Sequence, residues 1–292
     1  MGSKVTLITG TSTGIGFATA LLLARKGYNV HATMRDPERG GGALQTAANA
    51  AGASLSIAKL DVDDPACCER CIADVLTKEG RIDVLVNNAG VGELGVVEHA
   101  TDAFAKATFE TNFFGPLRLT RAVLPGMRER RSGTIVNVSS VAGIISGMGQ
   151  AMYCATKHAL ESISESLALE VREFGIRVAI IEPGIFKTPI IAKAIGGVAG
   201  HETSPYATSE RRIAAIYAQG GAVGGEPETV AEAILHAIET DTPKLRYPVG
   251  VDAPVFLEGR RGMSDEEWVE FGAPMSDDEF WALFAKTFPM PA

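Results

Sequence analysis

The sequence predicts an α/β protein: a doubly wound parallel sheet with helices on both faces, in a three-layer α/β/α arrangement. Short runs rich in β-branched residues alternate with helix-like stretches over the first 185 residues. These runs show little alternation of polar and apolar residues, which is typical of parallel strands covered on both faces. With 292 residues, of which 46% are hydrophobic, the chain can bury one large core or two small ones.

The elements follow one another in a regular order. Strands are expected over residues 5–10, 29–35, 54–62, 82–90, 133–140, 176–184 and 244–250. Helices are expected over residues 17–27, 67–79, 104–130, 153–175 and 227–240. Pro227 suits the first turn of the last helix, where a missing N–H is tolerated. This succession predicts a single domain over residues 1–251.

Two segments depart from the strand–helix succession. Residues 187–225 are rich in Gly, Ala and Ile around one helical piece, and we expect an insertion that covers the end of the sheet as a substrate lid. Residues 252–292 are expected to form a helical extension packed on the same domain. In this tail Ser264 precedes Glu267, and Ser276 precedes Glu279, at the capping-box spacing. Each pair therefore predicts the start of a short helix.

Charge and composition exclude several function classes. The formal net charge is −8 and the pI is about 5.3, which argues against a nucleic-acid binder. No apolar run reaches the roughly 18–20 residues that a membrane span needs. The first expected strand begins near Lys4, which leaves no room for a signal peptide, so a cytoplasmic location is expected.

Three of the four cysteines lie close together in "CCERC", residues 67–71. This resembles half of a metal site, but zinc needs four ligands and no Cys or His cluster in the sequence completes the set. The fourth cysteine, Cys154, is far along the chain. We therefore expect free thiols on a helix and no metal site.

A glycine-rich segment, "TGTSTGIG" (9–16), joins the first expected strand to the first helix. Its spacing is Gly10-x-x-x-Gly14-x-Gly16. Glycines there allow a tight turn and close backbone approach, and the helix N-terminus offers unpaired N–H groups to a pyrophosphate. A plain structural turn is the alternative, but the position at the first strand–helix junction favours a dinucleotide-binding loop.

The end of the second strand is where ribose specificity is set in such folds. Met34 stands where an acid would bind a free 2′-hydroxyl, and Arg35 follows it. An arginine presents a fork that matches a 2′-phosphate, so NADP(H) is favoured over NAD(H). The alternative is a surface arginine paired with Asp36. Asp61, at the end of the third strand, is expected to accept a hydrogen bond from the adenine amino group.

Four motifs occur in one order along the chain: "TGTSTGIG", "NNAG" (87–90), "NVSS" (137–140) and "YCATK" (153–157). With these motifs the sequence resembles the short-chain dehydrogenase/reductase family over roughly residues 4–250. The resemblance implies a Rossmann-type domain, a nicotinamide cofactor and interconversion of an alcohol and a carbonyl. The segment 29–37, the lid and the tail most resemble the 17β-hydroxysteroid and retinol dehydrogenase-like branch. The family also implies a homodimer or homotetramer.

The resemblance carries functional roles to matching positions. It implies a catalytic set of Asn112, Ser140, Tyr153 and Lys157, with Ser139 as a competitor for the serine role. Thr188 would hold the nicotinamide carboxamide. The full set expected to contact the cofactor is Gly10, Ser12, Thr13, Gly14, Ile15, Gly16, Arg35, Asp61, Val62, Asn88, Ala89, Gly90, Tyr153, Lys157, Pro183, Gly184, Phe186 and Thr188.

The spacing of Tyr153 and Lys157 has a chemical reading of its own. Residues four apart share one face of a helix, an arrangement also common on solvated surfaces. A tyrosine at its ordinary pKa of about 10 is a poor reversible proton donor near neutrality. A lysine ammonium one turn away is expected to stabilise tyrosinate and lower that pKa. A serine hydroxyl beside the carbonyl oxygen supplies a second donor where charge develops.

The expected surroundings of this pair are apolar. The segments after "NNAG", "SS" and "PG", together with the lid, offer Val91, Leu94, Ile145, Met148, Ile185, Phe186, Ile190, Ile191 and Tyr206. Such a lining favours a bulky hydrophobic secondary alcohol or ketone, of steroid, retinoid or aryl-ketone type. Two alternatives are a reductase of smaller, 3-oxoacyl-like carbonyls and a catalytically inactive NADP-binding scaffold or sensor.

Overall fold

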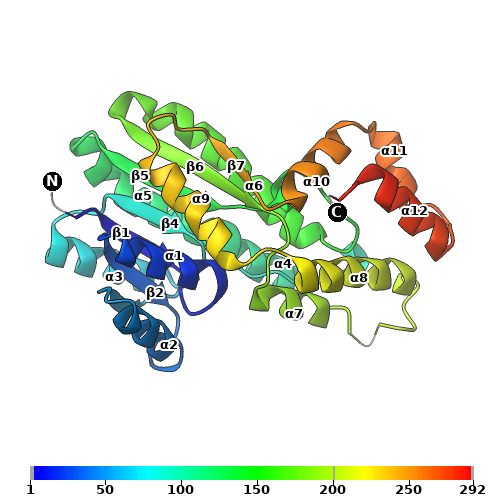
Figure 1. Cartoon of the computed structure of the whole chain (residues 1–292), viewed down its shortest axis with the longest axis horizontal. Coiled ribbons are helices and arrows are strands. Elements are labelled where there is room, and N and C mark those ends of the chain that lie inside the picture. The colour runs from blue at the N-terminus through cyan, green and yellow to red at the C-terminus, as the bar shows by residue number, and fades with distance from the viewer. Residues whose placement is uncertain (1–2, 200, 291–292) are drawn as a thin grey trace.

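Seven parallel strands form one sheet at the centre of the molecule (Figure 1). The computed structural model describes residues 3–199 and 201–290. In chain order the strands are β1 Val5–Thr9, β2 Asn29–Met34, β3 Ser56–Lys59, β4 Val84–Asn87, β5 Gly133–Val138, β6 Ile176–Pro183 and β7 Arg246–Val249. Their order across the sheet is β3-β2-β1-β4-β5-β6-β7. The direction of strand order therefore reverses between β1 and β4, the position where open α/β sheets bind ligands.

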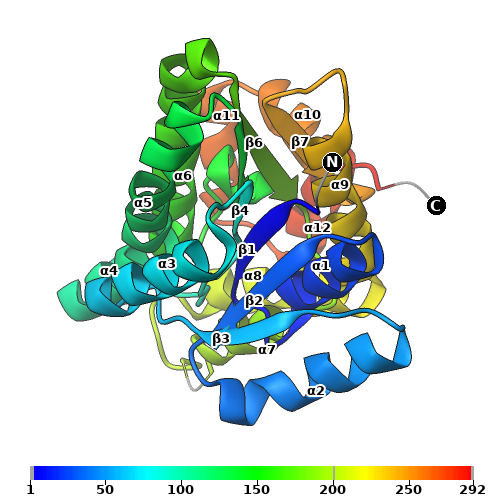
Figure 2. The same ribbon diagram turned by 90° about the vertical axis from the view of Figure 1, so that its left-hand side faces the viewer.

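Helices cover both faces of this sheet, and the end-on view separates the three layers (Figure 2). On one face lie α1 Gly14–Arg25, α2 Pro37–Ala50 and α9 Pro227–Glu239. On the other face lie α3 Pro65–Glu79, α5 Gly115–Glu129 and α6 Ala151–Val171, with α4 Asp102–Phe109 beyond them. Each face encloses its own hydrophobic cluster. The predicted doubly wound fold is confirmed.

The prediction of one long helix over residues 104–130 is wrong in one respect. It is divided into α4 and α5 by a π-helical turn, η2, at Glu110–Phe114. Gly115 follows directly, and a Cβ there would lie 2.9 Å from the Cβ of Val62. The close approach to the β3–α3 loop and the following Pro116 fix where α5 can begin. Helix α2 is a further element that was not predicted.

Residues 187–225, the expected lid, contain α7 Pro189–Gly196 and α8 Ala207–Val223. The C-terminal extension forms α10 Asp252–Arg261, α11 Asp265–Val269 and α12 Asp277–Thr287, which lie beyond α8 at one end of the molecule (Figure 1). Both predicted capping boxes are present, at Ser264 and at Ser276. The extension is fastened to α8 by Arg212, whose Nε lies 3.0 Å from Oδ1 of Asp277.

The aromatic residues of the extension form a hydrophobic cluster of their own. Phe271, Phe280 and Phe288 are buried at its centre, and Met148 and Ile216 pack against it from the body of the domain. The tail therefore packs on the same domain through apolar contacts, as its Trp and Phe content indicates.

The cysteines of "CCERC" lie on α3, inside the core cluster under that face of the sheet. All four cysteines are free and buried. Burial raises the pKa of Cys68 to about 11 and that of Cys71 to about 12. Neither thiol is readily deprotonated, so both are poor metal ligands. Within the described residues, no helix has the length and apolar character needed to cross a membrane.

Candidate active site

A cavity of about 710 Å³ opens at the carboxyl ends of the central strands. It is lined by residues from the β1–α1 loop, the ends of β2 to β6 and the start of α7. All the residues expected to contact the cofactor line it, as does Ser140. Of the predicted site residues, only Asn112 lies behind the lining.

The glycine loop has the shape that a pyrophosphate requires. A Cβ on Gly16 would lie 2.3 Å from the Gly10 carbonyl oxygen and 2.4 Å from Nδ2 of Asn88, so only glycine fits. Asn88 donates from Nδ2 to the Thr9 and Gly10 carbonyls, at 2.8 and 3.1 Å. Thr13 precedes the first turn of α1, and this end of the helix borders the cavity. The N–H groups of the first turn have no partner within the helix and are available to an anion there. These residues fit a dinucleotide phosphate.

The far end of the cavity is basic. Met34 is 3% exposed, whereas Arg35 is exposed and lines the cavity. Asp36 caps α2, with its Oδ1 accepting from the Arg39 N–H at 3.1 Å. Arg39 also lines the cavity and was not predicted. The sequence feature that could have indicated Arg39 is its place four residues after Arg35, on the first turn of the next helix.

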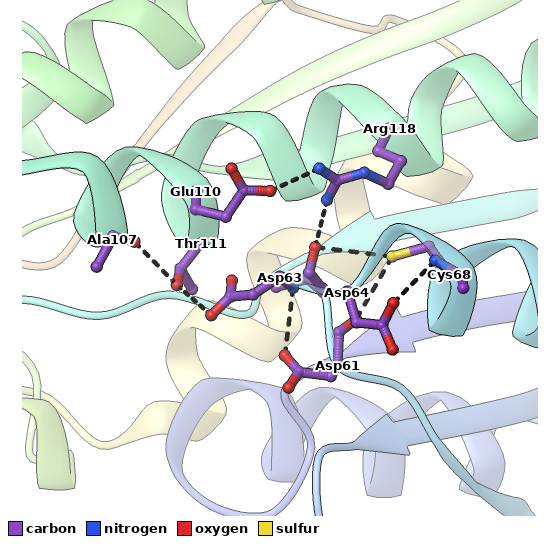
Figure 3. A network of polar contacts seen from close by, with 10 residues as sticks. Asp61, Asp63, Asp64, Cys68, Ala107, Glu110, Thr111 and Arg118 are labelled. Carbon is purple, nitrogen blue, oxygen red and sulfur yellow. Dashed lines mark hydrogen bonds and ion pairs between the residues drawn. The ribbon is translucent and has the colours of Figure 1, made fainter. Parts of the chain in front are cut away.

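The corner that carries Asp61 and Val62 is braced by a polar network (Figure 3). Arg118 of α5 donates from Nη1 to the Val62 carbonyl at 2.6 Å and from Nη2 to Glu110 at 2.5 Å. The Thr111 hydroxyl donates to Oδ2 of Asp63 at 3.0 Å. These contacts fasten the loop that carries Asp61 and Val62 to the π-helical turn, which also carries Asn112.

Asn112 is 1% exposed and uses both ends of its amide. Its Oδ1 accepts from the Val91 N–H and its Nδ2 donates to the Val91 carbonyl, each at 2.8 Å. Nδ2 also donates to the Thr156 hydroxyl at 3.0 Å. The side chain therefore joins the segment after β4 to Thr156 of α6, the residue that precedes Lys157. This geometry makes Asn112 a positioning residue.

Tyr153 and Lys157 share one face of α6 and line the same cavity. Nζ of Lys157 donates to the Val138 carbonyl at 2.8 Å and lies 5.7 Å from the centroid of the Tyr153 ring. Burial raises the pKa of Tyr153 to about 12, and a hydrogen bond with Ser140 offsets this in part. Burial also lowers the pKa of Lys157 to about 8, against an opposing effect of Glu161.

The expectation that Lys157 lowers the pKa of Tyr153 is thus wrong for the structure described. Withdrawal of the phenolate from water raises this pKa, and the hydrogen bond with Ser140 is the effect that lowers it, while Nζ of Lys157 is bonded to the Val138 carbonyl. Tyr153 consequently holds its proton across the neutral range.

The two serines after β5 face different partners. Ser140 accepts from the Ala142 N–H at 3.1 Å, and its hydroxyl interacts with Tyr153. Ser139 is 3% exposed and faces Glu161. This placement favours Ser140 as the partner of Tyr153, in agreement with the preference drawn from the motif spacing.

Two buried acids near Lys157 were not predicted. Glu161 and Glu182 are 4% and 1% exposed, and both face Arg246, at 3.0 and 3.4 Å from its Nε. Burial, with a smaller effect of Glu161, raises the pKa of Glu182 to about 7. Glu161 lies one helical turn after Lys157, a spacing that could have drawn attention to it.

The predicted apolar lining is divided by the structure. Val91, Leu94, Ile185, Ile190 and Ile191 line the main cavity. Two others, Ile145 and Met148, line a neighbouring cavity of about 310 Å³.

The two remaining predicted lining residues differ in their positions. Phe186 also lines the main cavity, but its ring is 2% exposed and packs against Gly225 and Gly250 in the core. Tyr206 lies outside both cavities, against His99.

The neighbouring cavity is almost wholly apolar and is bounded by the C-terminal extension. Phe256, Trp268, Phe280, Phe284 and Phe288 supply its aromatic lining.

The two cavities share lining residues, namely Val141, Gln150, Ile185 and Tyr217. The Tyr217 hydroxyl donates to Oε1 of Gln150 at 2.6 Å and so forms a polar partition between them.

Known proteins share this arrangement. Human retinol dehydrogenase 8 is 37% identical over 263 residues, which cover 85% of this chain and 82% of the relative. Mouse 17-beta-hydroxysteroid dehydrogenase type 1 is 37% identical over 260 residues, covering 85% of this chain and 74% of the relative. Both lie in the branch that the sequence resembles.

Solved structures agree. A short-chain dehydrogenase from Streptomyces avermitilis superposes with a TM-score of 0.80 at 40% identity, covering 92% of this chain and 96% of the other. A metagenomic short-chain oxidoreductase in complex with NADP gives a TM-score of 0.68 at 28% identity, covering 85% and 97%.

Residues 4–196 match the short chain dehydrogenase family, which is more than half of the chain. The match spans the glycine loop, the "NNAG" and "NVSS" segments and the Tyr153–Lys157 pair. This chain therefore belongs to the short-chain dehydrogenase family and is an NAD(P)-dependent oxidoreductase that acts on CH–OH and C=O groups.

Proposed function

We propose that the enzyme interconverts a hydrophobic secondary alcohol and its ketone with NADP(H), and that Tyr153 is the proton donor and acceptor. The observation that carries this proposal is the position of Ser140 and Tyr153. They line the cavity that fits a dinucleotide, and this cavity shares Val141, Gln150, Ile185 and Tyr217 with an apolar cavity closed by aromatic side chains. The substrate class is steroid-, retinoid- or aryl-ketone-like.

Each residue has a separate task in ketone reduction. The bound nicotinamide supplies the hydride. Tyr153 delivers its phenolic proton to the carbonyl oxygen as negative charge develops there. Ser140 donates a second hydrogen bond to the same oxygen. Lys157 provides positive charge beside the phenol, and Asn112 holds the Val91 backbone and the Thr156 hydroxyl of α6 in place.

The decisive variant is Tyr153→Phe, because it keeps the ring and removes the proton. We expect turnover to fall by about 10²–10⁴-fold, the usual contribution of a general acid, while coenzyme affinity is retained. An inactive scaffold or sensor would show no turnover to lose. Loss of coenzyme binding in this variant would indicate a structural role for the hydroxyl instead.

The preference for NADP(H) is supported by Arg35 and Arg39, two exposed cations at the far end of the cavity. Hydrogen bonds to charged groups contribute about 1.5–3 kcal/mol each. Arg35→Ala and Arg39→Ala should each weaken NADPH binding by about 10–100-fold and leave NADH binding nearly unchanged. Arg25→Ala, at the other end of α1, is the matched control. Equal wild-type affinity for both coenzymes would contradict this assignment.

The substrate class is tested by a panel that varies bulk at constant chemistry. Steroid ketones, retinoids, aryl ketones and short 3-oxoacyl esters are assayed with both coenzymes by absorbance of the reduced nicotinamide. We expect the highest kcat/KM for bulky apolar compounds. Turnover of small polar carbonyls alone would favour the reductase of 3-oxoacyl-like substrates and reject the proposed class.

Three further expectations come from the sequence. Assembly as a homodimer or homotetramer is tested by light scattering of the purified protein. The cytoplasmic location is tested by cell fractionation. The lid role of residues 187–225 is supported by Ile190 and Ile191, which line the cavity from α7.

A further inference from the structure

Three potential metal ligands, far apart in sequence, meet beside the lid. His99 ends a short 3-10 helix, η1 Val97–His99, that follows β4. His201 lies between α7 and α8, and Glu210 lies in the first turn of α8. Their ligand atoms all lie within 4.8 Å of one another. The sequence shows no metal-binding spacing here because more than a hundred residues separate His99 from His201.

The distances suit a small cation. Oε1 of Glu210 lies 3.0 Å from Nδ1 of His201 and 3.6 Å from Nδ1 of His99. Tetrahedral zinc with bonds of about 2.0–2.1 Å places neighbouring ligand atoms about 3.3–3.4 Å apart. An ion would therefore need only small side-chain adjustments to bind all three groups.

Glu210 is the residue that most needs a partner. Its side chain is 2% exposed, and its Oε2 is buried with no hydrogen-bond partner among the described residues. A buried carboxylate is costly unless it is paired or binds a metal. A protonated imidazole would satisfy Oε1 alone, whereas a divalent ion would neutralise the carboxylate group as a whole.

The site is also open to solution on one side. His99 and His201 are 36% and 35% exposed, so an ion and a water ligand can reach the cluster. Tyr206 packs edge-on against His99 and donates to Glu98, which adds a second carboxylate close by.

We propose that His99, His201 and Glu210 bind one zinc ion, with water as the fourth ligand, in a structural site that fastens the lid to the body. The ion would join the segment after β4 to the first turn of α8. Tyr217 lies two turns further along α8 and lines both cavities. Zinc would therefore hold the helix that separates the dinucleotide cavity from the aromatic one.

The test uses the tag-free, full-length protein after dialysis against a chelator. ZnCl2 is titrated by calorimetry, and CoCl2 is titrated by visible absorption, which reports four-coordinate geometry. We expect one equivalent to bind and the thermal midpoint to rise. His99→Ala and His201→Ala should each weaken binding by at least about tenfold, since even outer-shell changes cost 10–100-fold. His236→Ala, a histidine of α9 outside the cluster, should bind as the wild type does.

The variants are chosen so that each result decides the matter. Glu210→Gln is avoided because its side chain is buried, whereas the two histidines are about one-third exposed and tolerate truncation. Absence of zinc binding by the wild type would overturn the proposal. So would equal binding by wild type and both histidine variants, since the metal would then be held elsewhere. These measurements do not depend on the identity of the substrate.

Discussion

Phe280→Ala tests how strongly the extension is held on the domain. Phe280 of α12 is 1% exposed, and the guanidinium of Arg212 lies 4.5 Å from the centroid of its ring. Truncating a buried phenylalanine typically costs about 3–5 kcal/mol. The cation–π contact adds up to about 2 kcal/mol when it is shielded from water, which places the expected loss near the upper end of that range.

Tryptophan fluorescence provides a direct assay. The chain has two tryptophans, Trp268 and Trp281, and both pack in the aromatic cluster around Phe280. In urea, with an m-value of about 2 kcal/mol/M, a loss of about 5 kcal/mol lowers the midpoint of the fluorescence transition by about 2.5 M. Val251→Ala, which removes methyl groups from a side chain that is 75% exposed, should leave the midpoint unchanged.

The same variant also tests the role of the aromatic cavity. If the cluster contacts substrate, KM for a bulky ketone should rise while KM for NADPH stays constant. An unchanged fluorescence midpoint would refute the packing argument. A lower midpoint with unchanged KM for every bulky substrate would separate the extension from substrate binding.

Three further predictions follow from single groups in the site. Gly16→Ala should weaken coenzyme binding at least tenfold and destabilise the fold by about 1–3 kcal/mol, because its Cβ would strike backbone. Gly42→Ala, where a Cβ meets nothing within 4 Å, is its control in calorimetry. Because the pKa of Glu182 is raised to about 7, the protonated side chain stabilises the folded state. This contribution to stability is complete below the ordinary pKa of 4.5 and is lost as pH rises through 7. Glu182→Gln should therefore raise the thermal midpoint more at pH 8 than at pH 5, and equal shifts would contradict this. Because burial lowers the pKa of Lys157 to about 8, kcat/KM for ketone reduction should fall above that pH by up to tenfold per unit. The fall should be absent in Lys157→Arg, and a profile flat to pH 10 in the wild type would show that the ammonium is not required.

Local patterns were enough to predict much of the fold and the centre of the site. Tyr153 and Lys157 share a face because a helix repeats every 3.6 residues, whatever surrounds it. The serine–glutamate pairs that start α11 and α12 are likewise set by contacts within four residues. The glycine loop was identified because a glycine-rich segment between the first strand and the first helix favours dinucleotide binding.

The remaining features depend on contacts between distant segments. Phe186 lines the cavity, as predicted, but most of its ring is buried against Gly225 and Gly250, two glycines far from it in the sequence. The π-helical turn at Glu110–Phe114 arises from the close approach of Gly115 to Val62. That contact joins distant segments, so the pattern of apolar residues along the helix does not reveal it. The pKa of Tyr153 also escaped prediction, since burial decides its direction and burial is a property of the whole fold.

The boundary of the family match has a consequence for how this enzyme can diverge. The match ends at residue 196, whereas most of the residues that line the aromatic cavity come after it, from Ile213 to Phe288. The residues common to the family thus include those that line the coenzyme cavity but few of those that line the aromatic one. A lineage could exchange its tail, by recombination or by gradual substitution, and acquire a new substrate while the hydride-transfer machinery stays unaltered.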